Sequence, residues 1–530
     1  MNTPPETQRR RDHPWIFPLA LVITLAGLLG LGTTCAYAQL RADGAQFLLQ
    51  STFGILTESG DRFGAALAAG DFNRDGFDDL AIGIPFEDIG TTVDAGAVIV
   101  TYGSSLGLNQ GLTPAILLHQ DVPGTIDAAE YWDQFGGALA TGDFNNSGYI
   151  SLAVGVPGES FETSPGEWLY DAGAVQVFLG LPTGINPEID QFIQGSSFPG
   201  WDDREGDRLG TSLATGDIDL DDFDDLLVGI PGSYFDLTFG GGAGHVPGSS
   251  SSLQPGLGQI FGVPGTDPED GAGYSVAICN LNNSGPLEQV VAAPWGEWDV
   301  GPNGEGWTWI PSVPPIYFPG HQANTYLGYA LGVGDFRGAG HDQLLIGAPG
   351  WNTDGQTASG EVRLYDDGFP GLGVLSQNSP GIGGVSNSGD WFGEVIGVGD
   401  FNADGFDDGV FGVPREDLYD GSPDEKLNAG AVNVVYGGPG GLTSIGNQLW
   451  TLDDAGLFGA WEGDEFGDAV AAGDFDGDGV QDLAIGASGA SVDGQPGAGL
   501  VTILYGRHHA LIFSSKFEDG TTSEWDVIQP

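Results

Sequence analysis

DFNRDGFDD, residues 71–79, is followed directly by the apolar run LAIGIP, residues 80–85. Oxygen-bearing side chains stand at loop positions 1, 3, 5 and 9, which are Asp71, Asn73, Asp75 and Asp79. Alternate side chains of a turning segment converge on one point, and Gly76 at position 6 allows a left-handed turn that brings in the carbonyl of Phe77. An all-oxygen cage is what a hard cation requires, so the stretch predicts a Ca²⁺ site.

The composition favours a β protein rich in turns. The chain has 530 residues, with 93 Gly and 32 Pro, and 40% of its residues are hydrophobic, which is ample for a core. No long helical periodicity is present, so short strands and many turns are expected. The formal charge of −59 argues against nucleic acid or an anionic membrane as partner, because phosphates would be repelled.

The acidic loop returns along the chain and defines seven repeat units, called units one to seven below. Position 1 of the loop recurs at Asp71, Asp143, Asp217, Asn280, Asp335, Asp400 and Asp474. The mean spacing is about 67 residues, which is enough for four short strands with generous loops.

Each unit is expected to form a four-stranded antiparallel sheet. In unit one the strands are predicted at residues 65–70, 80–84, 95–102 and 115–119, each bounded by Gly, Pro or Asp. Sheets of this kind repeated around an axis make a β-propeller, whose closure protects the sheet edges. The predicted fold class is all-β, a seven-bladed propeller. A solenoid of stacked repeats is the alternative, although a solenoid would need capping ends.

Closure of the ring is predicted from the two ends of the repeat region. Residues 46–50 precede unit one as residues 115–119 precede unit two, and the last unit stops at its third strand, residues 500–505. The N-terminal strand is therefore expected to complete the seventh blade.

Two short motifs carry a family resemblance. Phe-Gly occurs at 63–64, 135–136, 392–393 and 466–467, and Gly-x-Pro occurs at 83–85, 155–157, 229–231, 347–349 and 412–414. Residues 45 to 506 resemble the FG-GAP repeats of the integrin α-subunit propeller and of bacterial exported proteins. The resemblance implies a seven-bladed propeller with Ca²⁺ in the loops between first and second strands, and a partner bound on the opposite face.

Four units carry a full set of oxygen ligands, which gives about four predicted Ca²⁺ sites. The remaining ligands are Asp217, Asp219, Asp221, the Phe223 carbonyl and Asp225 in unit three; Asp400, Asn402, Asp404, the Phe406 carbonyl and Asp408 in unit six; and Asp474, Asp476, Asp478, the Val480 carbonyl and Asp482 in unit seven. In unit three Asp222 replaces the usual Gly. Units two, four and five break the pattern. At the ligand positions unit two has Ser147 and Ser151, unit four has Asn280, Asn282 and Ser284, and unit five has Arg337 and Ala339.

The alternative is that these loops are tight solvated turns. Two like charges about 4 Å apart at an effective dielectric near 20 repel by roughly 4 kcal/mol, so a cation is the better explanation of clustered carboxylates. An EF-hand is excluded because Ile82 stands at loop position 12 and a strand follows. We expect these ions to be structural.

A recognition surface is predicted on the face opposite the acidic loops. Tryptophans gather before the first strands and between the second and third strands, at Trp132, Trp168, Trp201, Trp295, Trp298, Trp351, Trp391 and Trp461. Large rigid rings bind proteins and carbohydrates at low entropic cost, and some of these rings are expected to serve packing instead. No catalytic or organic-cofactor residues are predicted, which favours a binding or adhesion module over an enzyme. An extracellular hydrolase on the same scaffold is the alternative.

The N-terminal segment has the pattern of an export signal. Arginines at 9–11 precede an apolar stretch at 15–31, and Ala36-Tyr37-Ala38 fits a cleavage site. The predicted organisation is a signal peptide at 1–38, the propeller at 39–506, and a tail at 507–530 that is a possible sorting segment. The expected location is outside the cytoplasm: secreted, on the cell surface or periplasmic. No later stretch is apolar enough to span a membrane.

Overall fold

Short β-strands make up nearly all of the regular structure. The computed structural model describes residues 39–507 except 189, 236–238, 264–269, 284, 296–306, 311–315, 320–323, 367–368, 419–425 and 455. The predicted signal peptide, and the predicted tail after Arg507, lie outside this range. The helices in the described part are three short 3-10 turns, η1 (Gln50–Phe53), η2 (Gly195–Ser197) and η3 (Pro255–Leu257). No helix among the described residues has the length and apolarity needed to cross a bilayer.

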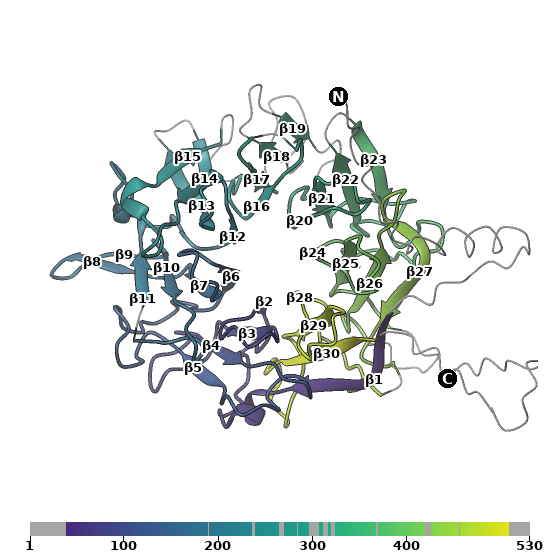
Figure 1. The fold of residues 1–530 in the computed structure, drawn as a ribbon, viewed down its shortest axis with the longest axis horizontal. Coiled ribbons are helices and arrows are strands. Elements are labelled where there is room, and N and C mark those ends of the chain that lie inside the picture. Colours follow the sequence, from purple (N-terminus) through teal and green to yellow (C-terminus); the bar gives the residue numbers. More distant parts are fainter. Residues whose placement is uncertain are drawn as a thin grey trace, which may run out of the picture. The chain divides into compact units, whose positions relative to one another are not determined.

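The first strand of every unit lies innermost, around a common axis (Figure 1). These strands are β2 (Ala66–Gly70), β6 (Ala138–Gly142), β12 (Leu213–Gly216), β16 (Ser275–Cys279), β20 (Leu331–Gly334), β24 (Val395–Gly399) and β28 (Val470–Gly473). Each contacts the inner strand of the next unit, and β28 contacts β2, so the cycle closes. Inner strands crowd at the axis, which explains why β2 and β28 consist largely of Ala and Gly.

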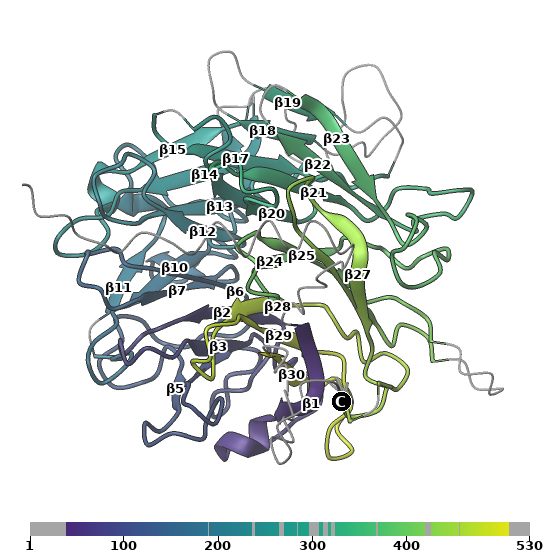
Figure 2. The same ribbon diagram turned by 45° about the vertical axis from the view of Figure 1, so that its right-hand side comes forward.

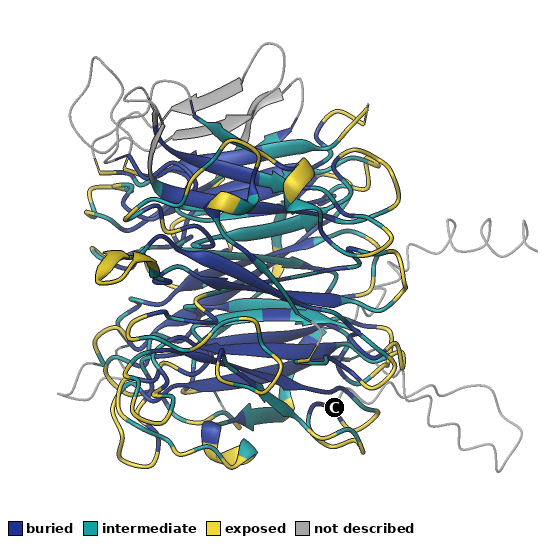
Figure 3. Cartoon of the chain, turned by 90° about the vertical axis from the view of Figure 1, so that its left-hand side faces the viewer, coloured by how far each residue is buried: buried dark blue, intermediate teal, exposed yellow. Residues whose placement is uncertain are grey.

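The second and third strands form the buried middle of each sheet, between exposed loops at both ends (Figure 3). The second strands are β3 (Asp79–Ile84), β7 (Ser151–Val156), β13 (Asp225–Phe235), β17 (Glu288–Ala293), β21 (Gln343–Ala348), β25 (Asp408–Val413) and β29 (Asp482–Ala487). The third strands are β4 (Ala97–Thr101), β10 (Ala174–Phe178), β14 (Phe239–Val246), β18 (Trp307–Ile310), β22 (Glu361–Asp366), β26 (Ala431–Tyr436) and β30 (Leu500–Arg507). All six residues of β3, β7, β21, β25 and β29 are buried, because each is covered by a sheet on both faces.

The outer strands complete the sheets and correct the expected fold class. They are β5 (Ile116–Leu118), β11 (Asp190–Ile193), β15 (Gln259–Gly262), β19 (Ile316–Pro319), β23 (Phe369–Leu375), β27 (Thr443–Trp450) and, from the N-terminal end, β1 (Gln39–Leu48). Six antiparallel blades of four strands are each built by one continuous segment. The remaining four-stranded sheet is composite, in the order β1-β30-β29-β28. The expected count of seven blades is therefore corrected to six self-contained blades and one sheet shared by both ends of the repeat region.

The N-terminal strand differs from its predicted bounds. It was expected at residues 46–50, whereas β1 runs from Gln39 to Leu48, and the next turn already begins at Gln50. β1 lies beside β30 (Figure 1 and Figure 2), with Phe47 opposite Thr502 and a register shift between Arg41 and Gln46. β1 pairs with the outer edge of β30. That edge would stay unpaired if the last unit had only its own three strands.

The Phe-Gly and Gly-x-Pro motifs join neighbouring sheets. Phe63 is fully buried, and its N–H donates to the carbonyl of Ala498 at 3.0 Å. Gly155 of the Gly-x-Pro motif faces Gly210 of the next unit, and a Cβ at 155 would lie 2.1 Å from the Gly210 carbonyl oxygen. The motif therefore requires Gly because two backbones meet there.

One hairpin was not predicted. β8 (Phe161–Ser164) and β9 (Glu167–Leu169) form a separate two-stranded sheet between β7 and β10 of unit two. Among the described residues a separate sheet of this kind occurs in unit two alone, so periodicity gave no signal for it.

Candidate metal centres and the opposite face

The acidic loop of unit one is folded around its own carboxylates. Oδ1 of Asp71 accepts a hydrogen bond from the N–H of Asp75, and Oδ2 accepts one from Gly76, both at 3.0 Å. Oδ2 of Asp79 accepts from the N–H of Phe72 at 3.0 Å, and Oδ1 accepts from Gly103 at 2.9 Å. Positions 1 and 9 thus anchor the loop at both ends.

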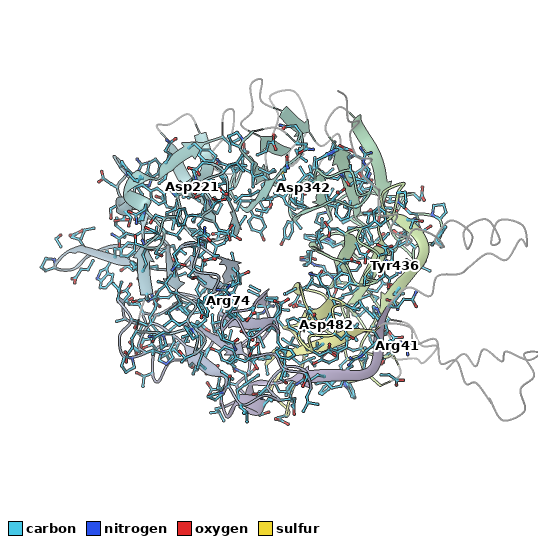
Figure 4. The ribbon with its side chains drawn as sticks, viewed as in Figure 1. Arg41, Arg74, Asp221, Asp342, Tyr436 and Asp482 are labelled. Carbon is cyan, nitrogen blue, oxygen red and sulfur yellow. The ribbon has the colours of Figure 1, made fainter. Side chains whose placement is uncertain are left out.

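The loops of units three, six and seven repeat this arrangement. The position 1 carboxylates of Asp217, Asp400 and Asp474 each accept from the N–H groups of loop positions 5 and 6. The position 9 carboxylates of Asp225, Asp408 and Asp482 are fully buried, and each accepts from position 2 and from a glycine near the end of the third strand or just after it. Figure 4 shows Asp221 and Asp482 in two different sheets of the ring.

Three of the buried position 9 carboxyls, in units one, six and seven, are hard to ionise without a cation. Burial, with neighbouring Asp charges as a further cause, raises the pKa of Asp79, Asp408 and Asp482 to about 8, although each accepts two backbone hydrogen bonds that lower it. A divalent cation bound to the loop would offset this penalty, because an opposite charge favours the ionised form.

Two of the loops bring three carboxylates within metal-binding reach. One oxygen each of Asp217, Asp219 and Asp225 lies within 4.8 Å of the others, and the same holds for Asp474, Asp476 and Asp478. The predicted loops of units one and six use Asn73 and Asn402 at position 3, and both residues are buried. All four donor sets consist of oxygen atoms, which suits Ca²⁺.

Arg507 is a member of the unit seven site that sequence reasoning missed. Its guanidinium Nη1 pairs with Oδ2 of Asp476 and lies 3.6 Å from Oδ2 of Asp478. Arg507 was assigned to the tail after the repeats, whereas it is the last residue of β30. The sequence did contain a signal for this position. Arg507 stands two residues after Tyr505, which is the place that Ser104 takes just after the third strand of unit one.

Unit five carries an arginine at loop position 3, where the other units carry Asn or Asp. Nη2 of Arg337, at loop position 3, pairs with Oδ2 of Asp366, and Nε2 of His341 lies 2.9 Å from Oδ1 of the same residue. Asp366 is fully buried at its side chain and stands where unit one has Tyr102. This loop neutralises its own buried carboxylate.

The predicted tryptophans occupy different environments. Trp132 and Trp461 are 56% and 67% exposed, and Trp168 and Trp295 are each 37% exposed. Trp201, Trp351 and Trp391 are covered by the guanidinium groups of Arg204, Arg363 and Arg415, at 4.1, 4.2 and 3.6 Å from the ring centres. Trp298 lies outside the described residues. The set is therefore divided between exposed rings and rings under arginine.

A cavity of about 670 Å³ opens among the inner strands at the end opposite the acidic loops. Residues from every unit line it, among them Arg62, Gln134, Thr211, Tyr274, Tyr329, Arg415 and Asp468. Arg415 pairs with Glu394 at 3.3 Å, and the rings of Tyr274 and Tyr329 are 5.0 Å apart. This cavity could not be predicted from the sequence, because each unit contributes only a few of its lining residues and they form no sequence motif.

Comparison with known proteins agrees with the repeat. The FG-GAP repeat model matches residues 63–101, 209–246 and 466–504. The bovine phosphatidylinositol-glycan-specific phospholipase D is 30% identical over 236 residues, which is 42% of this chain and 25% of that protein. Integrin alpha-PS5 of Drosophila melanogaster is 32% identical over 177 residues, covering 33% of this chain and 15% of that protein.

The matches cover only part of these proteins, since the chain spans a quarter or less of the length of the curated relatives it matches. Among solved structures, the Dos1 propeller matches with a TM-score of 0.43 and 11% identity, covering 88% of this chain and 98% of that one. Three stretches of the chain therefore match the FG-GAP repeat, and about a third of the chain is similar to an integrin alpha subunit.

Proposed function

We propose that this protein is an exported binding or adhesion module, in which Ca²⁺ stabilises the propeller and the opposite face holds a protein or glycan ligand. The cavity lined by all units carries this proposal, because it is a concave site built from the whole ring. The proposal includes a signal peptide at 1–38, the propeller at 39–506 and a C-terminal tail at 507–530.

Ca²⁺ is proposed at the loops of units one, three, six and seven. Their donors are carboxylate, amide and main-chain carbonyl oxygens, and three of the buried position 9 carboxyls have a raised pKa. The ions would join the first and second strands of each unit without contacting a ligand at the other end of the ring. Their role is therefore structural.

The chemistry of the cavity favours a polar ligand with flat or hydroxyl-bearing groups. Tyr274 and Tyr329 provide aromatic faces, and Arg415 provides a cation held between Glu394 and the ring of Trp391. Aromatic rings and arginine are the residue types that dominate binding energy at protein interfaces. A peptide segment or a saccharide meets these requirements.

The test is a binding screen of the purified protein against a glycan array and a peptide array, using Arg415→Ala and Tyr329→Ala. We expect loss of the signal seen for the unaltered protein. Arg74→Ala is the matched control, because Arg74 lies over the ring of Tyr149, 5.8 Å from its centre, at the acidic-loop end. Signals that survive both cavity variants, or that depend on Arg74, would overturn the placement of the ligand face.

A hydrolase is the second candidate, favoured by the 30% identity to a phosphatidylinositol-glycan-specific phospholipase D. The matched segment is 25% of that enzyme. Assay of the protein on phosphodiester and polysaccharide substrates separates the two candidates. Turnover abolished by an Asp468→Asn change in the cavity would favour the hydrolase.

A further inference from the structure

A cluster of acids in unit two lies at the end of the sheet opposite the acidic loops. Asp127 and Glu130 belong to the connection between β5 and β6, and Glu159 follows β7. One carboxylate oxygen of each lies within 4.8 Å of the other two. Both Asp127 and Glu130 reach Glu159 closely enough for a hydrogen bond, so a proton or a cation must stand between these oxygens.

A fourth acid faces this cluster without a partner for one of its oxygens. Asp133 is fully buried, and its Oδ2 accepts a hydrogen bond from the N–H of Glu130 at 2.5 Å. Its Oδ1 is buried and has no hydrogen-bond partner. Asp133 lies beside the cluster, because its carboxylate accepts from the main chain of Glu130 and its charge contributes to the raised pKa of Glu159. A buried carboxylate oxygen without a donor needs a ligand of its own.

The supporting framework recurs in other units, but the full cluster does not. The buried Glu159 accepts from Nε2 of Gln120 at 2.5 Å, as Glu416 accepts from Gln377 at 2.6 Å. Unit six has Gly384 and Asn387 where unit two has Asp127 and Glu130. Unit six therefore keeps the framework without these two carboxylates, whereas unit one has Glu58 at the position of Glu130 and Ile55 at that of Asp127.

The neighbouring charges do not neutralise these acids. The charged groups that act on Asp133, Glu130 and Glu159 are all other acids. Burial first, and then these neighbours, raise the pKa of Glu159 to about 10 and that of Glu130 to about 7. Shared protons or a bound cation would each relieve the repulsion, and the three convergent carboxylates, with Asp133 beside them, provide enough oxygen atoms for a cation.

We propose that Asp127, Glu130, Asp133 and Glu159 form a further Ca²⁺ site, at the end of the ring opposite the acidic loops. The ion would connect the β5–β6 connection to the start of the β7–β8 loop. It would also hold in place Tyr131 and Trp132, which are 60% and 56% exposed next to the ligands. This site is independent of the four loop sites and of the proposed ligand.

The test counts bound Ca²⁺ by native mass spectrometry with Ca²⁺ as the only added metal. The double variant Asp127→Asn with Glu130→Gln should bind one ion fewer than the unaltered protein. Glu416→Gln is the matched control, because it changes the same buried Gln–Glu framework where the two acids are missing, and its ion count should be unchanged. An equal count in the double variant and the unaltered protein means that protons alone hold the cluster, and overturns the proposal.

A second measurement keeps the carboxylates intact. Tb³⁺ substitutes for Ca²⁺ and emits when a nearby tryptophan is excited, and Trp132 is adjacent to Asp133. Trp132→Phe should remove most of the tryptophan-sensitised Tb³⁺ emission, whereas Trp461→Phe, which alters another exposed ring, should leave the emission from this site. Equal emission from both variants would contradict the site.

Discussion

The main-chain N–H of Asp474 donates to Oδ2 of Asp78 at 2.8 Å, and the N–H of Asp78 donates to the carbonyl of Asp474 at 3.0 Å. These residues stand 396 positions apart, in the last and the first acidic loops. The same reciprocal pair joins Asp224 to Asp143, Asp342 to Asn280, and Asp407 to Asp335. Loop position 8 therefore ties each of these acidic loops to the loop before it.

Replacing the carboxylate at the closing pair should weaken the ring. Asp78→Ala leaves the N–H of Asp474 without its acceptor, and we expect the free energy of unfolding to fall by about 1–3 kcal/mol. Chemical denaturation measures this change. Asp342→Ala removes the same pair inside the repeat region and should cost a similar amount. No loss in either variant would show that water replaces the carboxylate at no cost.

Stability should fall as pH rises, because several buried acids are held protonated. Burial raises the pKa of Glu416 from 4.5 to about 8, despite the hydrogen bond from Gln377. Between these pH values the unfolded chain releases this proton while the folded chain keeps it, so folding becomes less favourable. The contribution of Glu416 is full below about pH 4.5 and is lost as pH rises through about 8.

Glu416→Gln should flatten this pH dependence. The amide keeps an acceptor for Gln377 but carries no titrating group. Unfolding free energies measured from pH 4.5 to 8 should therefore decline less in the variant than in the unaltered protein. Glu462→Gln, at an exposed position, is the control and should reproduce the original slope. Parallel profiles for all three proteins would refute the assignment.

The internal cation of unit five predicts a contrast in calcium dependence. Arg337→Met leaves the buried Asp366 with His341 as its only remaining basic partner in the described ion pairs, and should destabilise the protein by about 3–5 kcal/mol with or without Ca²⁺. Asp408→Asn in unit six should reduce stability mainly when Ca²⁺ is present. Thermal melting with Ca²⁺ and with EDTA distinguishes the two. A calcium-dependent effect of Arg337→Met would place a metal in unit five.

The contact between the two motif glycines predicts a steric penalty. In Gly155→Ala the new Cβ would lie 2.1 Å from the carbonyl oxygen of Gly210, so a backbone must move. We expect a loss of about 1–3 kcal/mol in unfolding free energy, as for other overpacked sites. Gly256→Ala, where a Cβ meets no atom within 4 Å, is the control. Equal stability of the two variants would show that the sheets can separate locally.

The sequence predicted the features that repeat, and it missed those that occur once. The strands of unit one lie within two residues of their predicted bounds, because each strand is bounded by a local turn signal. Among the described residues, the separate hairpin β8–β9 and the pair of Arg507 with Asp476 occur in one unit each, and Asp127 is the member of the acid cluster around Glu159 that units one and six lack. Such contacts arise from tertiary proximity, which the periodicity of one sequence does not encode.

The acidic loops illustrate the same division within one site. Spacing alone predicted one loop of oxygen donors at residues 71–79, and their convergence on a cation stays a prediction. It did not indicate that position 9 accepts a hydrogen bond from Gly103, nor that Asp78 pairs with Asp474, because both partners depend on how the sheets assemble.

Thermal unfolding of the purified protein in EDTA and in added Ca²⁺ tests the central claim, that cations in four acidic loops stabilise the propeller. At free Ca²⁺ about a hundredfold above Kd, each site should add roughly 2.7 kcal/mol, so the melting temperature should rise steeply with Ca²⁺. The rise should shrink stepwise as Asp75, Asp221, Asp404 and Asp478 are changed to Asn one after another. A melting temperature that is the same in EDTA and in saturating Ca²⁺ would contradict the claim.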